Sequence, residues 1–256
     1  MNNPVLRAEH MKKIYNAGKE NAFEALHDIN FSVYEGEFIG IMGPSGSGKS
    51  TFINNISTID IPTEGSVYIH DKEVRSMSED EIGVFRYENL GFIFQYFNLL
   101  DTHTLYENIA MPLSLAGRTD AQIHDRIQEI AGKMNIAGLL VKYPYECSGG
   151  QRQRGAICRA LINDPKLIIA DEPTGNLDSR NSTELMKILQ DLNQKEGVTI
   201  VMVTHDPLIA SYSTRFIYIH DGNIETEIKR GGMTQEEYFR RIVDVNADES
   251  REVLAG

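Results

Sequence analysis

The sequence has little cysteine, no long apolar run and fewer basic than acidic residues. Two cysteines, Cys147 and Cys158, are too few for a disulfide framework, so nothing points to an oxidising compartment. No apolar run approaches the roughly 18 residues that span a bilayer, and Met1–Lys13 lacks the apolar core of a signal peptide. With 25 Lys and Arg against 37 Asp and Glu, the net charge of -12 argues against nucleic-acid partners, whose phosphates require clustered cations. We therefore expect a cytosolic protein whose membrane role depends on another protein.

What is present is the composition of a folded α/β domain. In a chain of 256 residues, 41% are hydrophobic and 24% charged, which is ordinary for a globular protein with a large core. Apolar β-rich runs alternate with helical patterns, which favours a mostly parallel α/β sheet. The predicted strands are Phe38–Met42, Gly91–Phe94, Leu167–Ala170 and Thr199–Val203, and the predicted helices are Lys49–Ile56, Gln151–Ile162 and Ser182–Lys195. The last two strands are apolar at consecutive positions, as expected for parallel strands buried on both faces.

Two regions depart from this alternation. Leu105–Met134 is almost entirely helical, with isoleucines at 123, 127 and 130, which predicts a helical lobe inserted in the α/β core. Near the end, Phe216–His220 and Ile224–Ile228 flank an Asp-Gly-Asn turn at 221–223, which is typical of a hairpin. A helical stretch, Thr234–Val245, follows, and we expect an acidic, frayed tail after it.

The strongest chemical signal is the phosphate-loop motif G-x-x-x-x-G-K-[ST], which lies between a predicted strand and a predicted helix. Its glycines let the backbone wrap closely, so that N–H groups and the helix N-terminus face a phosphate. Lys49 supplies a cation for the β- and γ-phosphates, and Ser50 supplies a hydroxyl for Mg²⁺, which prefers oxygen ligands. The residues that the motif assigns to the nucleotide are Gly43, Ser45, Gly46, Ser47, Gly48, Lys49, Ser50 and Thr51.

A pair of carboxylates, Asp171 and Glu172, follows the buried run Leu167–Ala170. At the carboxyl end of a parallel strand, this pair is expected beside the phosphate loop, where α/β sheets bind ligands. Asp171 then organises Mg²⁺, and Glu172 polarises the attacking water as general base. A solvated acidic turn is the simpler interpretation of the pair in isolation, but the upstream phosphate loop favours catalysis.

A third element distinguishes this chain from other P-loop nucleotidases. Ser148, Gly149, Gly150 and Gln151 open a predicted helix, where backbone N–H groups and a hydroxyl can face a phosphate. A small-residue helix cap explains a serine and two glycines equally well. The element is therefore ambiguous when it is considered alone.

In this order, the motifs resemble those of the ATP-binding subunits of ABC transporters, over nearly the whole chain. Gln95 resembles the family's Q-loop glutamine, Ser148–Gln151 its signature motif, and Asp178 the aspartate of its D-loop. His205 resembles the switch histidine. Tyr15 stands where the family stacks an aromatic ring on adenine, although ordinary packing also explains a tyrosine there.

The resemblance implies hydrolysis of ATP with Mg²⁺. Because stacking reads no base edge, a preference for ATP over GTP is an expectation from the family alone. The implied catalytic residues are Lys49, Gln95, Glu172 and His205, and the implied magnesium ligands are Ser50, Gln95 and Asp171. Residues expected to contact the nucleotide also include Tyr15, Gln95, Asp171, Asp178 and, from a partner chain, Ser148, Gly149, Gly150 and Gln151.

The same resemblance implies an α/β fold, with a P-loop NTPase core of the RecA-like type, an antiparallel β subdomain and an inserted α-helical lobe. We expect a single ABC ATPase domain over 1–256. The expected parts are the catalytic core with the β subdomain in 1–94 and 155–230, the helical lobe and signature in 95–154, and the C-terminal helix and tail in 231–256.

Partners are also implied by the resemblance. Two chains pair head to tail as a homodimer, and each ATP lies between one phosphate loop and the other chain's Ser148–Gln151. The dimer is peripheral, at the cytoplasmic face of the cell membrane, and it powers an integral-membrane permease. A permease helix is expected to dock beside Gln95 against the apolar run Tyr96–Leu100. Packing of the lobe on the core explains that run as well.

Finer features resemble the bacitracin-type (Bce-like) peptide-resistance ATPases of Gram-positive bacteria, within the macrolide-efflux and lipoprotein-releasing branch. These features are Asn98–Thr102, His205–Pro207 with Ala210–Tyr212, and the tail Glu227–Val245. They imply an FtsX-like permease, a sensor histidine kinase reached through it, and cell-wall-targeting peptides such as bacitracin or lantibiotics. A lipoprotein-releasing or cell-division ATPase is the alternative among transporters.

Three other classes of P-loop protein fit the sequence less well. DNA-repair ATPases of this type insert a long coiled coil between glutamine and signature, and the interval between Gln95 and Ser148 is too short for one. Their DNA also requires cations that this acidic chain lacks. Translation factors of this type carry two cassettes, and a monomeric P-loop kinase would not need Ser148–Gln151. The sequence therefore predicts a transporter ATPase.

Overall fold

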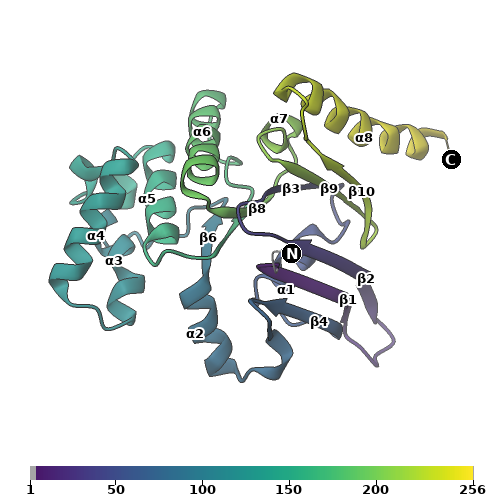
Figure 1. Cartoon of the computed structure of the whole chain (residues 1–256), viewed down its shortest axis with the longest axis horizontal. Coiled ribbons are helices and arrows are strands. Elements are labelled where there is room, and N and C mark those ends of the chain that lie inside the picture. The colour runs from purple at the N-terminus through teal and green to yellow at the C-terminus, as the bar shows by residue number, and fades with distance from the viewer. Residues whose placement is uncertain (1–3, 256) are drawn as a thin grey trace.

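The computed structural model describes the backbone of residues 4–255 and the side chains of residues 4–247. A lobe of helices lies at one end of the longest axis of the molecule, and in the rest of the molecule the six-stranded sheet and the four-stranded sheet lie one above the other (Figure 1). This arrangement confirms the predicted α/β core with an antiparallel β subdomain and an inserted helical lobe.

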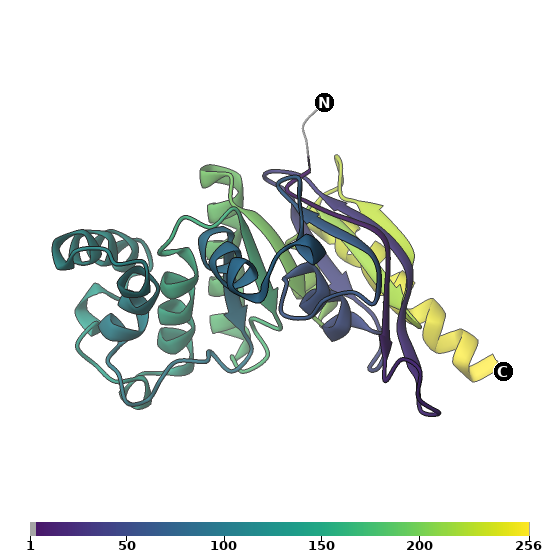
Figure 2. The ribbon, with the colours of Figure 1, turned by 90° about the horizontal axis from the view of Figure 1, so that it is seen from below.

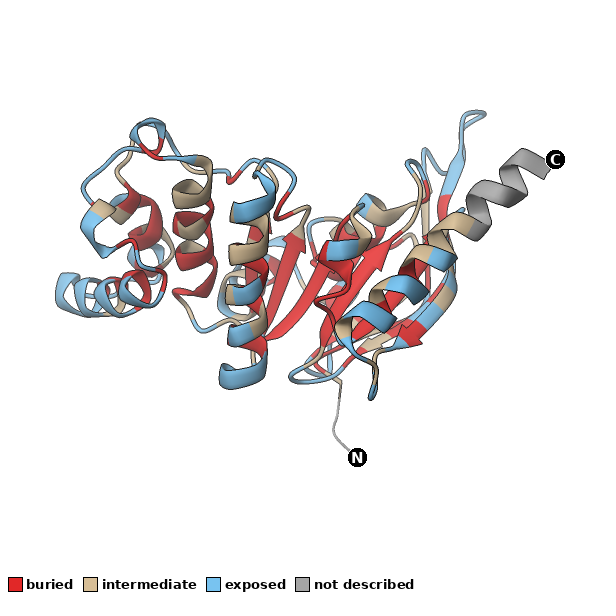
Figure 3. Ribbon diagram, turned by 90° about the horizontal axis from the view of Figure 1, so that it is seen from above, coloured by how far each residue is buried: buried red, intermediate tan, exposed pale blue. Residues whose placement is uncertain are grey.

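The six-stranded sheet has the order β10-β9-β3-β8-β7-β6, and all of its pairs are parallel except β9 with β10. Its strands are β3 (Phe38–Met42), β6 (Leu90–Phe94), β7 (Leu167–Asp171), β8 (Thr199–Val203), β9 (Arg215–His220) and β10 (Asn223–Lys229). The central strands are buried on both faces (Figure 3), as the consecutive apolar residues predicted. The four predicted parallel strands are therefore confirmed, with β6 and β7 each one residue longer.

The antiparallel sheet of the β subdomain has the order β2-β1-β4-β5. Its strands are β1 (Leu6–Tyr15), β2 (Phe23–Val33), β4 (Glu64–Ile69) and β5 (Lys72–Glu73). One apolar core joins this sheet, helix α1 (Lys49–Ile56) and the parallel sheet. Within it the rings of Phe31 and Phe52 meet edge to face, 5.1 Å apart. Figure 2 shows α1 enclosed between the two sheets.

The helical lobe contains α3 (Leu105–Leu115), α4 (Asp120–Lys133) and the start of α5 (Gly149–Leu161). Thr104 and Thr119 begin α3 and α4 with reciprocal capping boxes, and the isoleucines at 123, 127 and 130 face the core. α2 (Glu79–Asn89) links the β subdomain to β6, and α6 (Ser179–Glu196) packs on α5. α5 is one continuous helix. It therefore crosses the boundary expected between the helical lobe with the signature (95–154) and the second segment of the catalytic core (155–230).

The C-terminal helix, α8 (Gln235–Ala255), packs on the short α7 (Pro207–Ala210) and on β9 and β10. The hydroxyl of the buried Tyr238 donates to the carbonyl oxygen of Ile228 at 3.2 Å, and burial raises the pKa of Tyr238 to about 12. The predicted end at Val245 with a frayed tail is wrong, because no glycine or proline interrupts the helix before Gly256. None of the helices in residues 4–255 has the length and apolar character needed to cross a membrane.

Candidate functional site

Four parallel strands end at one edge of the six-stranded sheet, and each leads into a residue that the sequence assigned to the nucleotide. β3 runs into the phosphate loop and β6 into Gln95. β7 ends at Asp171, followed by Glu172, and β8 ends two residues before His205. The strands β3, β8, β7 and β6 are neighbours in the sheet, so these side chains gather at its carboxyl edge, where ligands bind in α/β folds.

The phosphate loop passes close to the turn between β9 and β10. A Cβ atom at Gly43 would lie 1.9 Å from the carbonyl oxygen of Ile219, so only glycine fits there. α1 then begins at Lys49, with Gly48 as its N-cap, no side-chain cap and no acidic residue in its first turn. The first N–H groups and the positive end of the helix dipole are therefore suited to an anion.

Lys49 and Ser47 add polar groups to this loop. The Lys49 ammonium donates to the carbonyl oxygens of Gly43 (2.8 Å) and Pro44 (2.6 Å). The Ser47 hydroxyl is buried and, within the described part of the chain, has no hydrogen-bond partner. The adjoining pocket of about 150 Å³ is lined by Phe23, Ala25, Gly46, Gly48, Lys49, Ser50 and Thr51. A cation, an orphaned hydroxyl and a helix N-terminus together fit a phosphate group.

The turn between β9 and β10 fastens the phosphate loop to the β subdomain. The N–H of Gly222 donates to the carbonyl oxygen of Ser47, and the N–H of His27 on β2 donates to the carbonyl oxygen of Gly222, each at 2.9 Å. Gly222 has a φ of +72°, and its Cβ would lie 2.6 Å from the His27 ring, so the turn requires glycine. Gly222 therefore positions the loop, a role that the hairpin pattern in the sequence could not predict.

Gly222→Ala is expected to weaken ATP binding about tenfold, because the added methyl group strains the turn and releases the loop from β2, and such strain costs about 1–3 kcal/mol. Calorimetric titration with MgATP measures the change. Gly231→Ala is the matched control, since Gly231 also has a positive φ but no atom near its Cβ. An equal loss of affinity in both variants would contradict a specific role for the turn.

Glu172 and His205 meet at the ends of β7 and β8. Nδ1 of His205 lies 2.8 Å from Oε2 of Glu172, whose side chain is 18% exposed. Glu172 has a φ of +48°, a left-handed conformation that costs a non-glycine residue about 1–2 kcal/mol and often marks functional sites. Beside it, burial and then the Glu172 charge raise the pKa of Asp171, whereas Lys49 lowers it. The edge therefore holds two carboxylates, one of them in contact with an imidazole.

Gln95 follows β6, the strand that pairs with β7 in the sheet. The Gln95 side chain packs on Gly175, whose Cβ would be 2.6 Å from the Gln95 Nε2. The backbone carbonyl oxygen of Gln95 accepts from the Asn176 side chain at 2.8 Å. Gln95, Asp171 and Ser50 all offer oxygen atoms, which suit Mg²⁺. No cluster of three or more His, Cys, Asp and Glu among the described residues could hold a metal alone. This donor set fits an ion that is also bound by phosphate oxygens and water.

Ser148 and Asp178 lie in a second group, at the starts of α5 and α6. Ser148 Oγ accepts from the N–H of Gln151 (3.3 Å), and the Gln151 side chain accepts from the N–H of Ser148 (2.9 Å), so the helix cap that the sequence allowed is present. A hydrogen bond from the Asn181 backbone lowers the pKa of Asp178. α5 packs on α3, α4, α6 and β6, whereas α1 packs on β1 and β2 (Figure 1). The phosphate loop before α1 and Ser148 before α5 therefore stand on elements with different packing partners in one chain.

Tyr15 lies at the end of β1, beside α1, with its hydroxyl 3.4 Å from Thr51 Oγ1. Its register partner on β2 is Phe23, which lines the phosphate-loop pocket and is 61% exposed. Sequence reasoning missed Phe23, because the hairpin between β1 and β2 gave no local signal of its register. An exposed aromatic residue opposite the predicted adenine-stacking tyrosine extends the same surface.

Comparison with known proteins yields consistent matches. The family model described as ABC transporter matches residues 26–175. The chain is 47% identical over 241 residues to the ABC transporter ATP-binding protein YxdL of Bacillus subtilis (94% of this chain, 93% of that protein). It is 44% identical to the bacitracin export ATP-binding protein BceA of Halalkalibacterium halodurans (93% and 94%). A solved dimeric structure of the cassette MJ0796 of Methanocaldococcus jannaschii, bound to ADP and Pi, is 40% identical with a TM-score of 0.81, covering 89% of this chain and all of that one.

Proposed function

Because this chain belongs to the ABC transporter family, as an ATP-binding subunit that hydrolyses ATP and powers a membrane permease, we propose that two copies pair head to tail around shared ATP sites. The observation that carries the proposal is the separation of the two phosphate-binding elements, the loop before α1 and Ser148 before α5. Each group offers part of a cage for a triphosphate. A second copy would complete it with its own Ser148–Gln151, and Asp178 would lie at the seam.

Within the proposed site, each residue acts through its own chemistry. Lys49 and the loop N–H groups bind the β- and γ-phosphates, while Tyr15 stacks on adenine. Mg²⁺, when bound, neutralises phosphate charge. Its proposed protein ligands are Ser50, Gln95 and Asp171. Glu172 accepts a proton from water as the water oxygen bonds to the γ-phosphorus and the bond to the ADP oxygen breaks. His205, held by Glu172 through Nδ1, offers Nε2 to the γ-phosphate.

Light scattering on the Glu172→Gln protein tests the shared site. We expect its mass to double with MgATP and to remain that of a monomer without it, because the γ-phosphate joins the two groups and the variant cannot remove it. Adding Ser148→Arg to the same protein should prevent the doubling, since the bulky cation blocks the second group. A protein that binds ATP and stays monomeric would contradict the proposal.

The proposed docking site of the permease is the groove between α2, β6 and the helical lobe. This groove, of about 400 Å³, is partly walled by Phe92 and Phe94, whose rings stack 5.7 Å apart. The sequence of Tyr96–Leu100 allowed two interpretations, packing of the lobe on the core and docking of a permease helix, and its residues differ in which of the two they suit. Phe97 is 8% exposed and packs against Arg152 of α5, whereas Tyr96 is 73% exposed. An amphipathic permease helix would bury Tyr96 and the groove.

Tyr96→Asp is therefore expected to lower the recovery of the permease with a tagged subunit about tenfold or more, because a charge would enter an apolar contact. Mass spectrometry of complexes purified from membranes measures the recovery. Tyr34→Asp is the control, at an exposed tyrosine in the turn between β2 and β3. Equal recovery with both variants would contradict docking at Tyr96.

We further propose that the permease handles cell-wall-targeting peptides such as bacitracin or lantibiotics, with a sensor histidine kinase reached through it. The similarity to a bacitracin export subunit supports this proposal. Identifying the permease in the same purified complex tests this proposal. An FtsX-like permease that confers bacitracin resistance would support the handling of cell-wall-targeting peptides. A lipoprotein-releasing or cell-division permease would instead support the alternative.

A further inference from the structure

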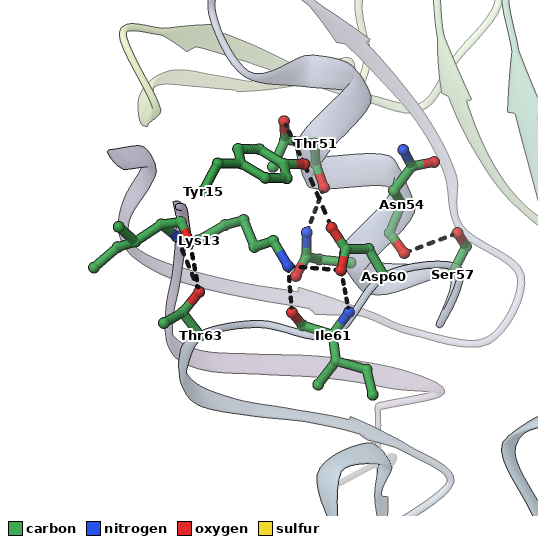
Figure 4. Close-up of polar contacts among 10 residues, drawn as sticks. Lys13, Tyr15, Thr51, Asn54, Ser57, Asp60, Ile61 and Thr63 are labelled. Atoms are coloured by element: carbon green, nitrogen blue, oxygen red, sulfur yellow. Dashed lines mark hydrogen bonds and ion pairs between the residues drawn. The ribbon is translucent and has the colours of Figure 1, made fainter. Parts of the chain in front are cut away.

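We propose that Lys13 and Asp60 position the ring of Tyr15, and thereby set the affinity of the site for the adenosine part of ATP rather than for its phosphates. The inference rests on the proposed stacking role of Tyr15. It concerns the place where the end of β1 passes α1, shown in Figure 4.

Lys13 supports one side of the Tyr15 ring. The two residues are two positions apart on β1, so their side chains share a face of the strand. The Lys13 ammonium lies 5.2 Å from the centroid of the Tyr15 ring, within the range of a cation–π contact. Only 12% of the Lys13 side chain is exposed. The lysine is therefore part of the packing beneath the ring.

Asp60 holds the Lys13 ammonium in this place. Oδ1 of Asp60 accepts from Lys13 Nζ at 2.6 Å, and the carbonyl oxygen of Ile61 accepts from the same ammonium at 2.8 Å. Oδ1 also accepts from the backbone N–H of Ile61 at 2.8 Å, which orients the carboxylate. A charge with two short hydrogen bonds is held far more firmly than an exposed lysine.

The Tyr15 ring needs this support because its own hydrogen bonds are long. Its hydroxyl lies 3.4 Å from both Thr51 Oγ1 and Asp60 Oδ2. Tyr15 is also the last residue of β1 and is 38% exposed. A stacking platform contributes fully only when the ring is already oriented before the base arrives.

The same contacts connect the ring to the phosphate end of the site. The backbone N–H of Asp60 donates to the carbonyl oxygen of Asn54 on α1 at 3.0 Å, and Thr51 is on α1 as well. α1 begins at the phosphate loop. Lys13 and Asp60 therefore place the base platform at a set distance from the loop.

Calorimetry with two ligands, MgATP and magnesium tripolyphosphate, tests the inference. Lys13→Met is expected to weaken ATP binding about fivefold, within the range of one cation–π contact, and to leave tripolyphosphate affinity within about twofold. Asp60→Asn should act in the same direction, and Lys13→Arg should retain ATP affinity. Lys12→Met is the matched control, because Lys12 is the neighbouring lysine and pairs with Glu64 instead.

Unchanged ATP affinity in Lys13→Met, or an equal loss for both ligands, would overturn the inference. Tyr15→Ala separates this failure from that of the proposed function. If Tyr15→Ala leaves the ratio of ATP to tripolyphosphate affinity unchanged, the stacking role of Tyr15 is wrong. If Tyr15→Ala lowers that ratio and Lys13→Met does not, only the positioning role is wrong.

Discussion

Replacing Glu172 with glutamine is expected to lower ATP turnover about 100-fold or more while ATP binding is retained. Glutamine keeps the size of the side chain, and its oxygen can still accept a hydrogen bond from His205, which contacts the carboxylate at 2.8 Å. It cannot take a proton from water, however, and a general base contributes about 10²–10⁴-fold to a reaction rate. Phosphate release under steady-state conditions measures turnover, and calorimetry measures binding.

Glu196→Gln provides the matched control for this experiment. It makes the same chemical change at the end of α6, at the opposite edge of the sheet, where Glu196 pairs with Lys133 at 3.0 Å. Surface ion pairs of this kind contribute about 0–1 kcal/mol to stability, so the control should keep its turnover. Wild-type turnover in Glu172→Gln would mean that another group removes the proton.

The helices and strands that the sequence predicted best are those with a strong local signal. The phosphate-loop helix Lys49–Ile56 and the strands Phe38–Met42 and Thr199–Val203 have the predicted bounds, since their periodicity and flanking glycines are local. The extension of α8 to Ala255 was missed, because an acidic composition resembles a frayed tail although nothing in it ends a helix. The individual strands of the β subdomain were missed as well, because bulges interrupt the pairing of β1 with β2.

For the site, the sequence predicted which residues follow the strands but not which of them touch. Strand order explains the difference. β7 and β8 are separated by α6 in the sequence and adjacent in the sheet, so the contact of Glu172 with His205 exists only after folding. The same holds for the turn at Gly222 against Ser47 and for Lys13 with Asp60. Motifs in the sequence identify the residues that can carry out the chemistry. The residues that hold them in position come from parts of the chain that are distant in sequence.

Lys49→Ala is expected to weaken ATP binding about 10- to 150-fold, as the loss of one or two hydrogen bonds from a charged group predicts. The ammonium donates to the carbonyl oxygens of Gly43 and Pro44, which are in the phosphate loop. Calorimetric titration with MgATP measures the loss. Lys187→Ala, at an exposed lysine on α6, should bind ATP like the wild-type protein. Unchanged binding in Lys49→Ala would contradict the phosphate-loop assignment.

The ligand dependence of this loss identifies its cause. Lys49 acts on phosphates, so Lys49→Ala should weaken ATP and tripolyphosphate by the same factor. Lys13 is proposed to act on the base platform, so Lys13→Met should weaken ATP alone. Because the two ammonium groups contact different parts of the chain, the carbonyl oxygens of the loop and the Asp60 carboxylate, their effects should add in the double variant. A common factor for both ligands in both variants would mean that the two lysines support one cooperative site instead.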